Sequence, residues 1–357
     1  MELLILFITS RCNLNCNACF YKSSLNNKSD MSFLQISKII NNIPHTKAVL
    51  ITGGEPFLNE DIFSILQLLI KNYTISVNTN GFLTTKIKEV IEKLLDGNPK
   101  NNVYVYVSID GSEITHNSMR KNNLSYMKAI DTLRLLTAIR NKYCRLKVCV
   151  SSIISPQNYM EIVSLASELY SEFKPDYYDF EVERSNEETK NYFKANFEAL
   201  NSVFKAIFKF LLNNYTDMYP SESRRYKTQY ENLLNNKNWD FPCCAGKEAA
   251  VVYPDGNLAA CEIRSEKINL SDYNYDINKA INSELMINEI KKINDERCFC
   301  THGCWVQTSL QKYYNDRAGN NYKNARKLMM RELYGSERLK FYFKKIIKKI
   351  NGLLIKR

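Results

Sequence analysis

The sequence predicts an α/β fold in which six βα units form an open parallel sheet or a partial (β/α)6 barrel. Up to about residue 213, short apolar segments rich in Val, Ile and Tyr alternate with longer segments of helical periodicity. Consecutive βα units favour right-handed crossovers, which make the strands parallel. The predicted strands are residues 3–9, 48–52, 74–78, 103–109, 146–152 and 178–183.

Apolar segments between these strands predict the helices. Asp30 and Ser32 are candidate N-caps of the first helix, and Asp61 lies at the start of the second. In parallel α/β folds, ligands bind at the carboxyl ends of the strands, so motifs that follow strands mark the expected site. The predicted helices are residues 32–42, 61–72, 85–95, 125–141 and 158–173, followed by a long helical stretch over 187–214.

Length and composition divide the chain into four parts. A chain of 357 residues is long enough for about two domains. We expect a core over residues 1–215, a polar linker over 216–242, a second domain over 243–310 and a helical basic tail over 311–357. The second domain holds six of the eleven cysteines.

The net charge of +11 is concentrated in the tail. Residues 338–357 contain eight Lys or Arg and no acidic residue, so the rest of the chain has 41 basic and 38 acidic residues. A nearly neutral body argues against a nucleic-acid-binding face. The tail segment 339–355 is amphipathic and basic, which fits either peripheral contact with an anionic membrane surface or a C-terminal helix packed on the body.

The cysteines are expected to be thiols or metal ligands. The chain shows no signal peptide, and no segment has the roughly 18 uninterrupted apolar residues of a membrane span. We therefore expect a cytoplasmic protein, in a reducing compartment where disulfides are rare. Cys144 and Cys149 flank or lie in a predicted strand, and we expect them to be core thiols.

Three closely spaced cysteines follow the first predicted strand. Cys12, Cys16 and Cys19 can supply three thiolates to a 4Fe–4S cluster and leave its fourth iron open to a small chelating ligand. Their spacing resembles the signature of the radical S-adenosylmethionine (SAM) superfamily, which places it after the first strand. The resemblance implies a SAM-binding 4Fe–4S cluster on these residues and an electron donor such as flavodoxin or ferredoxin.

A glycine-rich turn, Gly53-Gly54-Glu55-Pro56, ends the second predicted strand. The glycines allow close approach of a ligand to the backbone, and Pro56 keeps the preceding residue extended. In the superfamily a turn of this sequence binds the amino group of the SAM methionine, so Glu55 is expected to supply a carboxylate. A simple structural turn is the alternative for the motif alone.

Motifs after the third and fourth strands extend the resemblance. The third strand ends in a Thr-Asn-Gly run that contains Asn80, and the fourth ends in a Ser-Ile-Asp-Gly run that starts at Ser108. By the resemblance, Ser108 and Arg120 contact the ribose and carboxylate of SAM, because a guanidinium fork suits a carboxylate. His116 is expected to be structural, with a catalytic role as the alternative.

The chain departs from the superfamily at the residue before the third cysteine. That residue is usually aromatic and lies near the adenine of SAM, whereas here it is Ala18. Phe20, directly after the third cysteine, is the candidate replacement, and other adenine contacts are the alternative.

A second cysteine group surrounds a predicted hairpin over residues 249–261, whose turn is Pro254-Asp255-Gly256. The group resembles the auxiliary-cluster domain of SPASM/Twitch proteins, including a Gly and a Cys with four residues between them. The resemblance implies one auxiliary 4Fe–4S cluster. Its expected ligands are Cys244, Cys261, Cys304 and either Cys298 or Cys300. A second auxiliary cluster, which would need non-cysteine ligands, and a zinc site of four cysteines, or of three with His302, stay open.

The resemblance implies reductive cleavage of SAM to a 5′-deoxyadenosyl radical that abstracts hydrogen from a substrate carbon. We expect a net oxidation or rearrangement of a sugar- or cyclitol-type substrate, since the chain begins at the first strand without a peptide-recognition domain. Modification of a ribosomally made peptide is the alternative, and a non-catalytic metal-binding protein is the alternative of another class. Glu181, Glu183 and Arg184, which end the sixth strand, face either the substrate or solvent.

Overall fold

The computed structural model describes all residues except 28–29, 45, 185–186, 216–218, 236 and 333–357. Within this part, nine strands form one sheet in the order β6-β5-β4-β3-β2-β1-β7-β8-β9. The first six strands pair in parallel, which confirms the predicted parallel α/β fold. They are β1 (Leu3–Phe7), β2 (Ala48–Thr52), β3 (Thr74–Thr79), β4 (Val103–Ser108), β5 (Leu146–Ile154) and β6 (Tyr177–Val182).

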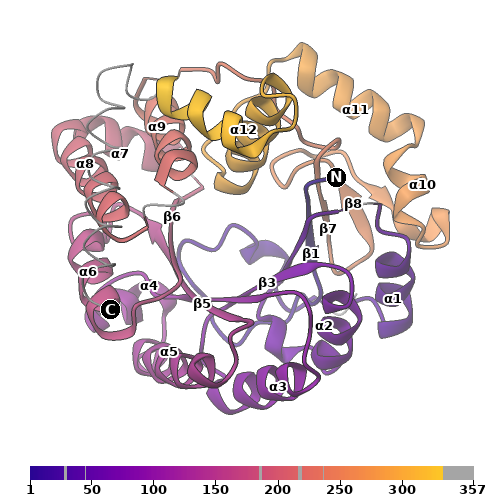
Figure 1. Ribbon diagram of the computed structural model, residues 1–357, viewed down its shortest axis with the longest axis horizontal. Coiled ribbons are helices and arrows are strands. Elements are labelled where there is room, and N and C mark those ends of the chain that lie inside the picture. The colour runs from indigo at the N-terminus through magenta and orange to yellow at the C-terminus, as the bar shows by residue number, and fades with distance from the viewer. Residues whose placement is uncertain (28–29, 45, 185–186, 216–218, 236, 333–357) are drawn as a thin grey trace.

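Helices follow each of these strands and form an outer ring around the curved sheet (Figure 1). They are α1 (Phe33–Asn41), α2 (Ile62–Ile70), α3 (Thr84–Asp96), α4 (Glu113–Arg120), α5 (Ser125–Lys142) and α6 (Ile162–Phe173), with short 3-10 turns at Lys22–Ser24 and Pro56–Leu58. The Ser32 hydroxyl accepts a hydrogen bond from the Gln35 amide, which confirms Ser32 as the N-cap of α1. The sequence did not predict α4, which separates the fourth strand from α5.

Alternation along the strands separates the apolar core from a polar interior. In β4, Val103, Val105 and Val107 are fully buried, while Tyr106 and Ser108 point to the opposite face. The buried residues pack into the core beneath the helices. The inward positions of several strands are therefore free to carry polar side chains, as a ligand-binding interior requires.

The cysteine-rich second unit continues the same sheet. Its first strand, β7 (Ala249–Val252), pairs in parallel with β1. The predicted hairpin is confirmed, because β7 pairs antiparallel with β8 (Asn257–Ala259), and β9 (Ile268–Asn269) adds to the edge. A 3-10 turn (Leu270–Tyr273) and the helices α10 (Ile277–Ile281), α11 (Glu284–Asp295) and α12 (Gly303–Arg317) complete the unit. The strands of the expected core and those of the expected second domain therefore belong to one continuous sheet.

The predicted linker over residues 216–242 is wrong, because most of it is a helix, α9 (Tyr219–Asn235). The helix packs against α8 (Phe197–Asn214) and α12. Its sequence lacks an apolar stripe because several of its buried positions are polar: Glu222, Arg224, Arg225 and Gln229. The predicted long helix before it is divided into α7 (Glu187–Ala195) and α8.

The amphipathic tail segment 339–355 lies outside the described residues, as does most of the basic stretch 338–357. The chain is helical over residues 322–332, at the end of the described part. Among the described residues, no helix combines the length and apolar character needed to cross a membrane.

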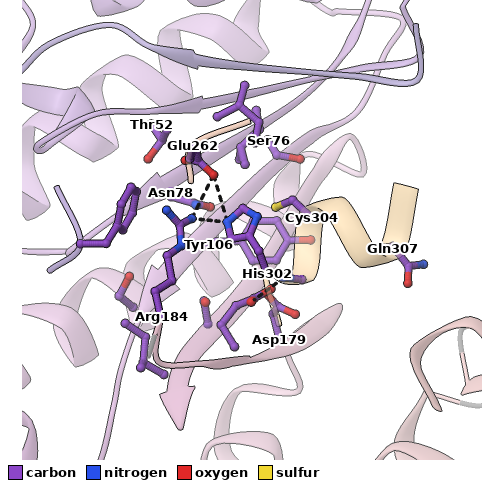
Figure 2. A pocket seen from close by; sticks show the side chains of 18 of the residues that line it. Thr52, Ser76, Asn78, Tyr106, Asp179, Arg184, Glu262, His302, Cys304 and Gln307 are labelled. Atoms are coloured by element: carbon purple, nitrogen blue, oxygen red, sulfur yellow. Dashed lines mark hydrogen bonds and ion pairs between the residues drawn. The ribbon is translucent and has the colours of Figure 1, made fainter. Parts of the chain in front are cut away.

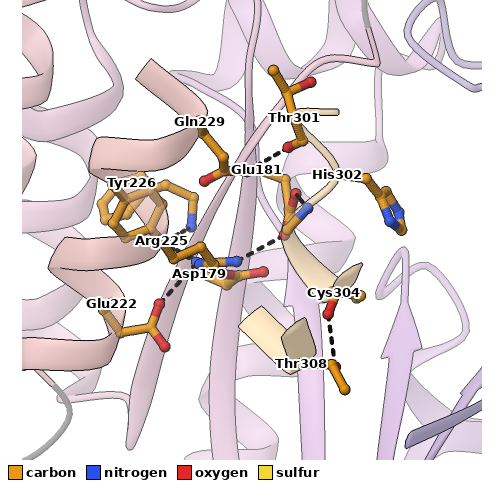
Figure 3. Close-up of polar contacts among 12 residues, drawn as sticks. Asp179, Glu181, Glu222, Arg225, Tyr226, Gln229, Thr301, His302, Cys304 and Thr308 are labelled. Atoms are coloured by element: carbon orange, nitrogen blue, oxygen red, sulfur yellow. Dashed lines mark hydrogen bonds and ion pairs between the residues drawn. The ribbon is translucent and has the colours of Figure 1, made fainter. Parts of the chain in front are cut away.

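One buried guanidinium joins α9 to the last parallel strand. Arg225, only 5% exposed, contacts Asp179 at 2.5 Å and Glu181 at 2.9 Å on β6, and Glu222 of its own helix at 3.0 Å (Figure 3). The Phe180 amide donates to the Tyr226 hydroxyl at 2.9 Å. Ion pairs and a hydrogen bond therefore make part of the contact between α9 and the sheet.

Replacing Arg225 with Met should lower the free energy of unfolding by about 3 kcal/mol, because three carboxylates, one buried and two half-buried, would lose their cation. Arg134→Met is the matched control, since Arg134 also contacts two carboxylates but is 59% exposed; we expect a change within about 0.5 kcal/mol. Chemical denaturation measures both. Equal losses in the two variants would show that the buried cluster does not hold α9.

Candidate active site

A cavity of about 660 Å³ fills the interior of the curved sheet. Its wall runs from Leu3, at the start of β1, to Cys12 in the loop beyond that strand, and on to Cys304 in the first turn of α12. The two cysteine-bearing parts of the chain therefore meet at one cavity, although about 290 residues separate Cys12 from Cys304.

All three N-terminal cysteines line this cavity. Burial raises the pKa of Cys12 to about 11, with smaller contributions from the neighbouring Glu55, Cys16 and Cys19. The Leu14 amide donates to Cys12 Sγ at 3.5 Å, and Arg120 Nη1 donates to Cys16 Sγ at 3.8 Å. Three thiols so close together become thiolates readily only when a positively charged group binds them, so these residues fit a 4Fe–4S cluster.

The glycine turn lies directly against the backbone that leads to Cys12. The Gly54 amide donates to the Thr9 carbonyl at 2.8 Å, and the Glu55 amide donates to the Arg11 carbonyl at 2.7 Å. A Cβ on Gly54 would lie 2.2 Å from the Arg11 carbonyl oxygen, and one on Gly53 would lie 2.4 Å from that of Thr9. Only glycine permits this contact, so the two motifs hold each other in place.

Glu55 is a buried carboxylate on the cavity wall, 1% exposed. It accepts hydrogen bonds from the Thr79 hydroxyl at 2.8 Å, the Asn80 amide at 2.8 Å and the Phe57 amide at 3.2 Å. Burial raises its pKa to about 7 despite these bonds, which lower it. A bound ammonium group would offset the cost of burying this negative charge.

Further side chains predicted for the cofactor meet on the same wall. Ser108, Asn80 and Arg120 all line the cavity. Arg120 Nε and Nη2 donate to one oxygen of Asp110, at 2.7 and 2.6 Å, so that carboxylate fixes the guanidinium beside Cys16. Phe20 also lines the cavity, and Pro56 is buried at the start of its 3-10 turn.

His116 is buried away from the cavity lining, so the structure supports its expected structural role. The Asp110 amide donates to His116 Nδ1 at 3.0 Å, and Tyr126 packs edge-on against the ring. Burial and the nearby Arg120 charge lower the pKa of His116 to about 4, which keeps the ring neutral and able to accept.

In the second group, four thiols influence one another electrostatically. Burial raises the pKa of Cys243 to about 11 and of Cys261 to about 12, with smaller contributions from Cys298 in both cases. Burial also raises the pKa of Cys300, with further contributions from Cys261, Cys243 and Cys298. These four thiols therefore lie within electrostatic range of one another. No group of three or more Cys, His, Asp or Glu in the described residues is placed to hold a single metal ion.

Two further predicted ligands, Cys244 and Cys304, have other surroundings, and the predicted ligand set stays a prediction. The Cys244 amide donates to Ser309 Oγ at 3.0 Å, and its side chain packs into the core, as that of Cys261 also does. Cys304 lines the main cavity; burial raises the pKa of its thiol, and the carboxylates of Glu181 and Glu262 raise it further. The sequence alone does not show which thiol of the adjacent pair Cys243-Cys244, or which of Cys298, Cys300 and Cys304, points toward the other cysteines. Cys149 is a buried core thiol as expected, whereas Cys144 is exposed.

An ion-pair bridge connects the first cysteine loop to the second unit (Figure 2). Arg184 contacts Glu262 at 3.1 Å and also His302, and its guanidinium stacks 3.4 Å above the Phe20 ring. Burial opposes ionisation of Glu262, but the Arg184 charge and the contacts with His302 outweigh it and lower its pKa to about 2. The bridge therefore holds Phe20 against residues that follow β6 and β8.

The end of β6 faces the cavity rather than solvent. Glu181, Glu183 and Arg184 all line it, which decides between the two expectations for these residues. Glu181 accepts from the Gly303 amide at 3.1 Å, and burial raises its pKa to about 7, with a contribution from Asp179. Sequence reasoning missed Asp179, although its place two residues before Glu181 puts it on the same strand face.

The comparisons with known proteins agree with this site. Residues 6–169 match the Radical SAM superfamily. This match covers a little less than half of the chain. The matched segment includes the N-terminal cysteines, the glycine turn, Asn80, Ser108 and Arg120. The motifs that led to the fold prediction and to the SAM-site prediction therefore lie in a single segment that matches one superfamily.

Two curated relatives illustrate the radical SAM likeness. The uncharacterized protein MJ0907 of Methanocaldococcus jannaschii is 33% identical over 138 residues, which cover 38% of this chain and 47% of that protein. The antilisterial bacteriocin subtilosin biosynthesis protein AlbA of Bacillus subtilis is 32% identical over 135 residues, covering 36% of this chain and 29% of AlbA. The chain thus spans less than half the length of either relative.

A solved structure shares the fold of this chain. Native anSMEcpe with bound AdoMet (SAM) and a Cp18Cys peptide aligns with a TM-score of 0.56 and 17% identity, covering 99% of each chain. The likeness in fold therefore extends beyond residues 6–169 to the cysteine-rich second unit.

Replacing Gly54 with Ala should lower the free energy of unfolding by about 2 kcal/mol, because the new Cβ meets the Arg11 backbone. Gly97→Ala is the control, since Gly97 has a φ of −68° and its Cβ would lie 3.3 Å from the Leu94 carbonyl oxygen; we expect a change within about 0.5 kcal/mol. Denaturation of the protein without cofactors tests this. Two equal changes would mean that the close contact is not needed.

Proposed function

We propose that this radical SAM protein cleaves SAM reductively and uses the product radical to abstract hydrogen from a substrate carbon. The observation that carries the proposal is one cavity shared by the three N-terminal cysteines, the Glu55 turn and the end of β6. A SAM-binding wall and a substrate-binding wall then face the same space. A non-catalytic metal-binding protein would not need this shared cavity.

The chain's own residues bind and orient SAM on the first wall. Cys12, Cys16 and Cys19 would hold the 4Fe–4S cluster, which when reduced supplies the electron that breaks the S–C5′ bond of SAM. Glu55 accepts the methionine ammonium group, since its carboxylate is buried and lines the cavity. Arg120, fixed by Asp110, presents its remaining N–H groups to the SAM carboxylate.

The second cysteine group, outside the cavity lining, fits an auxiliary iron–sulfur site of the SPASM/Twitch kind. We assign its ligands to Cys243, Cys261, Cys298 and Cys300, because their thiols influence one another electrostatically. Four thiolates complete the coordination of a 4Fe–4S cluster, which suits electron transfer rather than substrate ligation. Flavodoxin or ferredoxin is the proposed electron donor.

For the substrate, we favour a peptide over the sugar-type molecule that the sequence led us to expect. One relative is named for bacteriocin biosynthesis, and the solved structure with the same fold contains a peptide beside AdoMet. A cavity of about 660 Å³ falls within the usual range for ligand pockets and admits one or two side chains of a peptide.

The proposal predicts that reduced, anaerobically reconstituted protein converts SAM to 5′-deoxyadenosine and methionine. Cys12→Ala should abolish 5′-deoxyadenosine formation, because the cluster loses a ligand. Cys144→Ala is the control, since Cys144 is exposed and is not part of the cavity wall; it should retain the wild-type rate. Chromatography of the nucleoside product measures both. Undiminished product from Cys12→Ala would refute the proposed function.

Iron content tests the auxiliary ligand set separately. Cys261→Ala should lose about four iron atoms per chain, the content of one cubane cluster, while Cys304→Ala keeps the full content. The reason is that Cys304 faces the cavity and Cys261 belongs to the four-thiol group. Equal iron loss in both variants would restore Cys304 as a ligand, and no loss in either would remove the auxiliary cluster.

A further inference from the structure

The cavity that the N-terminal cysteines line also has an acidic wall. We use this name for five cavity-lining carboxylates on β6, on α9 and after β8: Asp179, Glu181, Glu183, Glu222 and Glu262. Asp179, Glu181 and Glu183 alternate along one strand, so that they share its inward face. The two cations on this wall are Arg184 and Arg225.

These cations do not balance the carboxylates. Arg184 is engaged by Glu262 at 3.1 Å, in the bridge to Phe20. Arg225 is shared by three carboxylates, at 2.5, 2.9 and 3.0 Å (Figure 3). Glu183 has no cationic partner among the described residues. Three negative charges of the acidic wall therefore lack a counter-ion of their own.

The pKa values of three carboxyl groups on the acidic wall are raised, which agrees with this excess of negative charge. Burial raises the pKa of Glu181 to about 7, and the Asp179 charge adds to the rise against the pull of Arg225 and Arg184. Burial also raises the pKa of Glu183 and of Glu222. A cation placed between them would return these groups to the charged form.

A second observation concerns buried polar atoms that lack a partner. His302 is 5% exposed and lines the cavity, and its Nδ1 has no hydrogen-bond partner. The other ring nitrogen, Nε2, is already engaged, since it lies 3.0 Å from the Glu262 carboxylate and also contacts Arg184. Gln307 Oε1, on the same wall, is an acceptor without a partner, which a hydrogen-bond donor on a ligand would satisfy.

We propose that the substrate binds this wall through a cationic group, an aliphatic ammonium or a guanidinium, that lies among Asp179, Glu181 and Glu183 and donates to acceptors on the wall. The inference rests on the proposed function, because it assigns the substrate side of the same cavity. A basic side chain of a peptide and the amino group of an amino sugar share this chemistry. A substrate that is neutral or anionic in this region would leave these half-buried carboxylates uncompensated.

The test is calorimetric binding to the reconstituted protein with SAM, using two matched pairs of probes. The peptide pair is acetyl-Gly-Lys-Gly-amide and acetyl-Gly-norleucine-Gly-amide, and the sugar pair is glucosamine and glucose. We expect the cation of one pair to bind about tenfold tighter than its neutral partner. The pair that discriminates identifies the source of the cation.

Glu183→Gln should reduce that discrimination to about twofold or less, and Glu183→Lys should abolish it. Both variants should fold, since Glu183 has no ionic partner among the described residues. Glu168→Gln, an exposed position on α6, is the control and should keep the wild-type ratio. Overturning results are weak or equal binding within both pairs, or a ratio that Glu183→Lys leaves unchanged.

A separate measurement distinguishes the two ways in which the account can fail. The same preparations are assayed for 5′-deoxyadenosine formed from SAM under reducing conditions. Protein that makes the nucleoside but does not prefer a cationic probe refutes only the cationic substrate. Protein that prefers the cation but makes no nucleoside refutes the proposed reaction and leaves the charge preference of the wall standing.

Discussion

The contact between the Gly53-Gly54 turn and the backbone from Thr9 to Arg11 is the constraint on which the site depends. Two backbone hydrogen bonds join these segments, at 2.8 and 2.7 Å, and no side chain fits between them. The contact fixes the loop that carries the cysteines relative to Glu55. The carboxylate and the thiols therefore keep one arrangement before any cofactor binds, which reduces the entropy cost of binding.

The opposite wall is held by charge rather than by apolar packing. Arg225 joins α9 to β6 through three carboxylates, and Arg184 joins the strand end to Glu262 and Phe20. Buried ion pairs add little net stability but fix geometry, because each partner is costly to leave alone. The same groups that position the second cysteine unit thus also give the cavity its negative character.

Apolar periodicity was enough to predict the parallel sheet and its crossovers, because β4 and β6 send branched and aromatic residues to the core. It failed for α9, whose buried positions are polar, so that the helix lacks an apolar stripe. Spacing found the cysteines of both groups. It could not separate Cys243 from Cys244, since the choice depends on which thiol points toward Cys261, a tertiary feature.

The central claim is that Cys12, Cys16 and Cys19 hold a cluster with one open iron beside the SAM pocket. Electron paramagnetic resonance of the reduced, anaerobically reconstituted Cys261→Ala variant, recorded with and without SAM, tests it most directly, because that variant retains the N-terminal site. The account predicts a 4Fe–4S signal whose g-values shift when SAM is added. A signal that SAM leaves unchanged, or no signal, would contradict it.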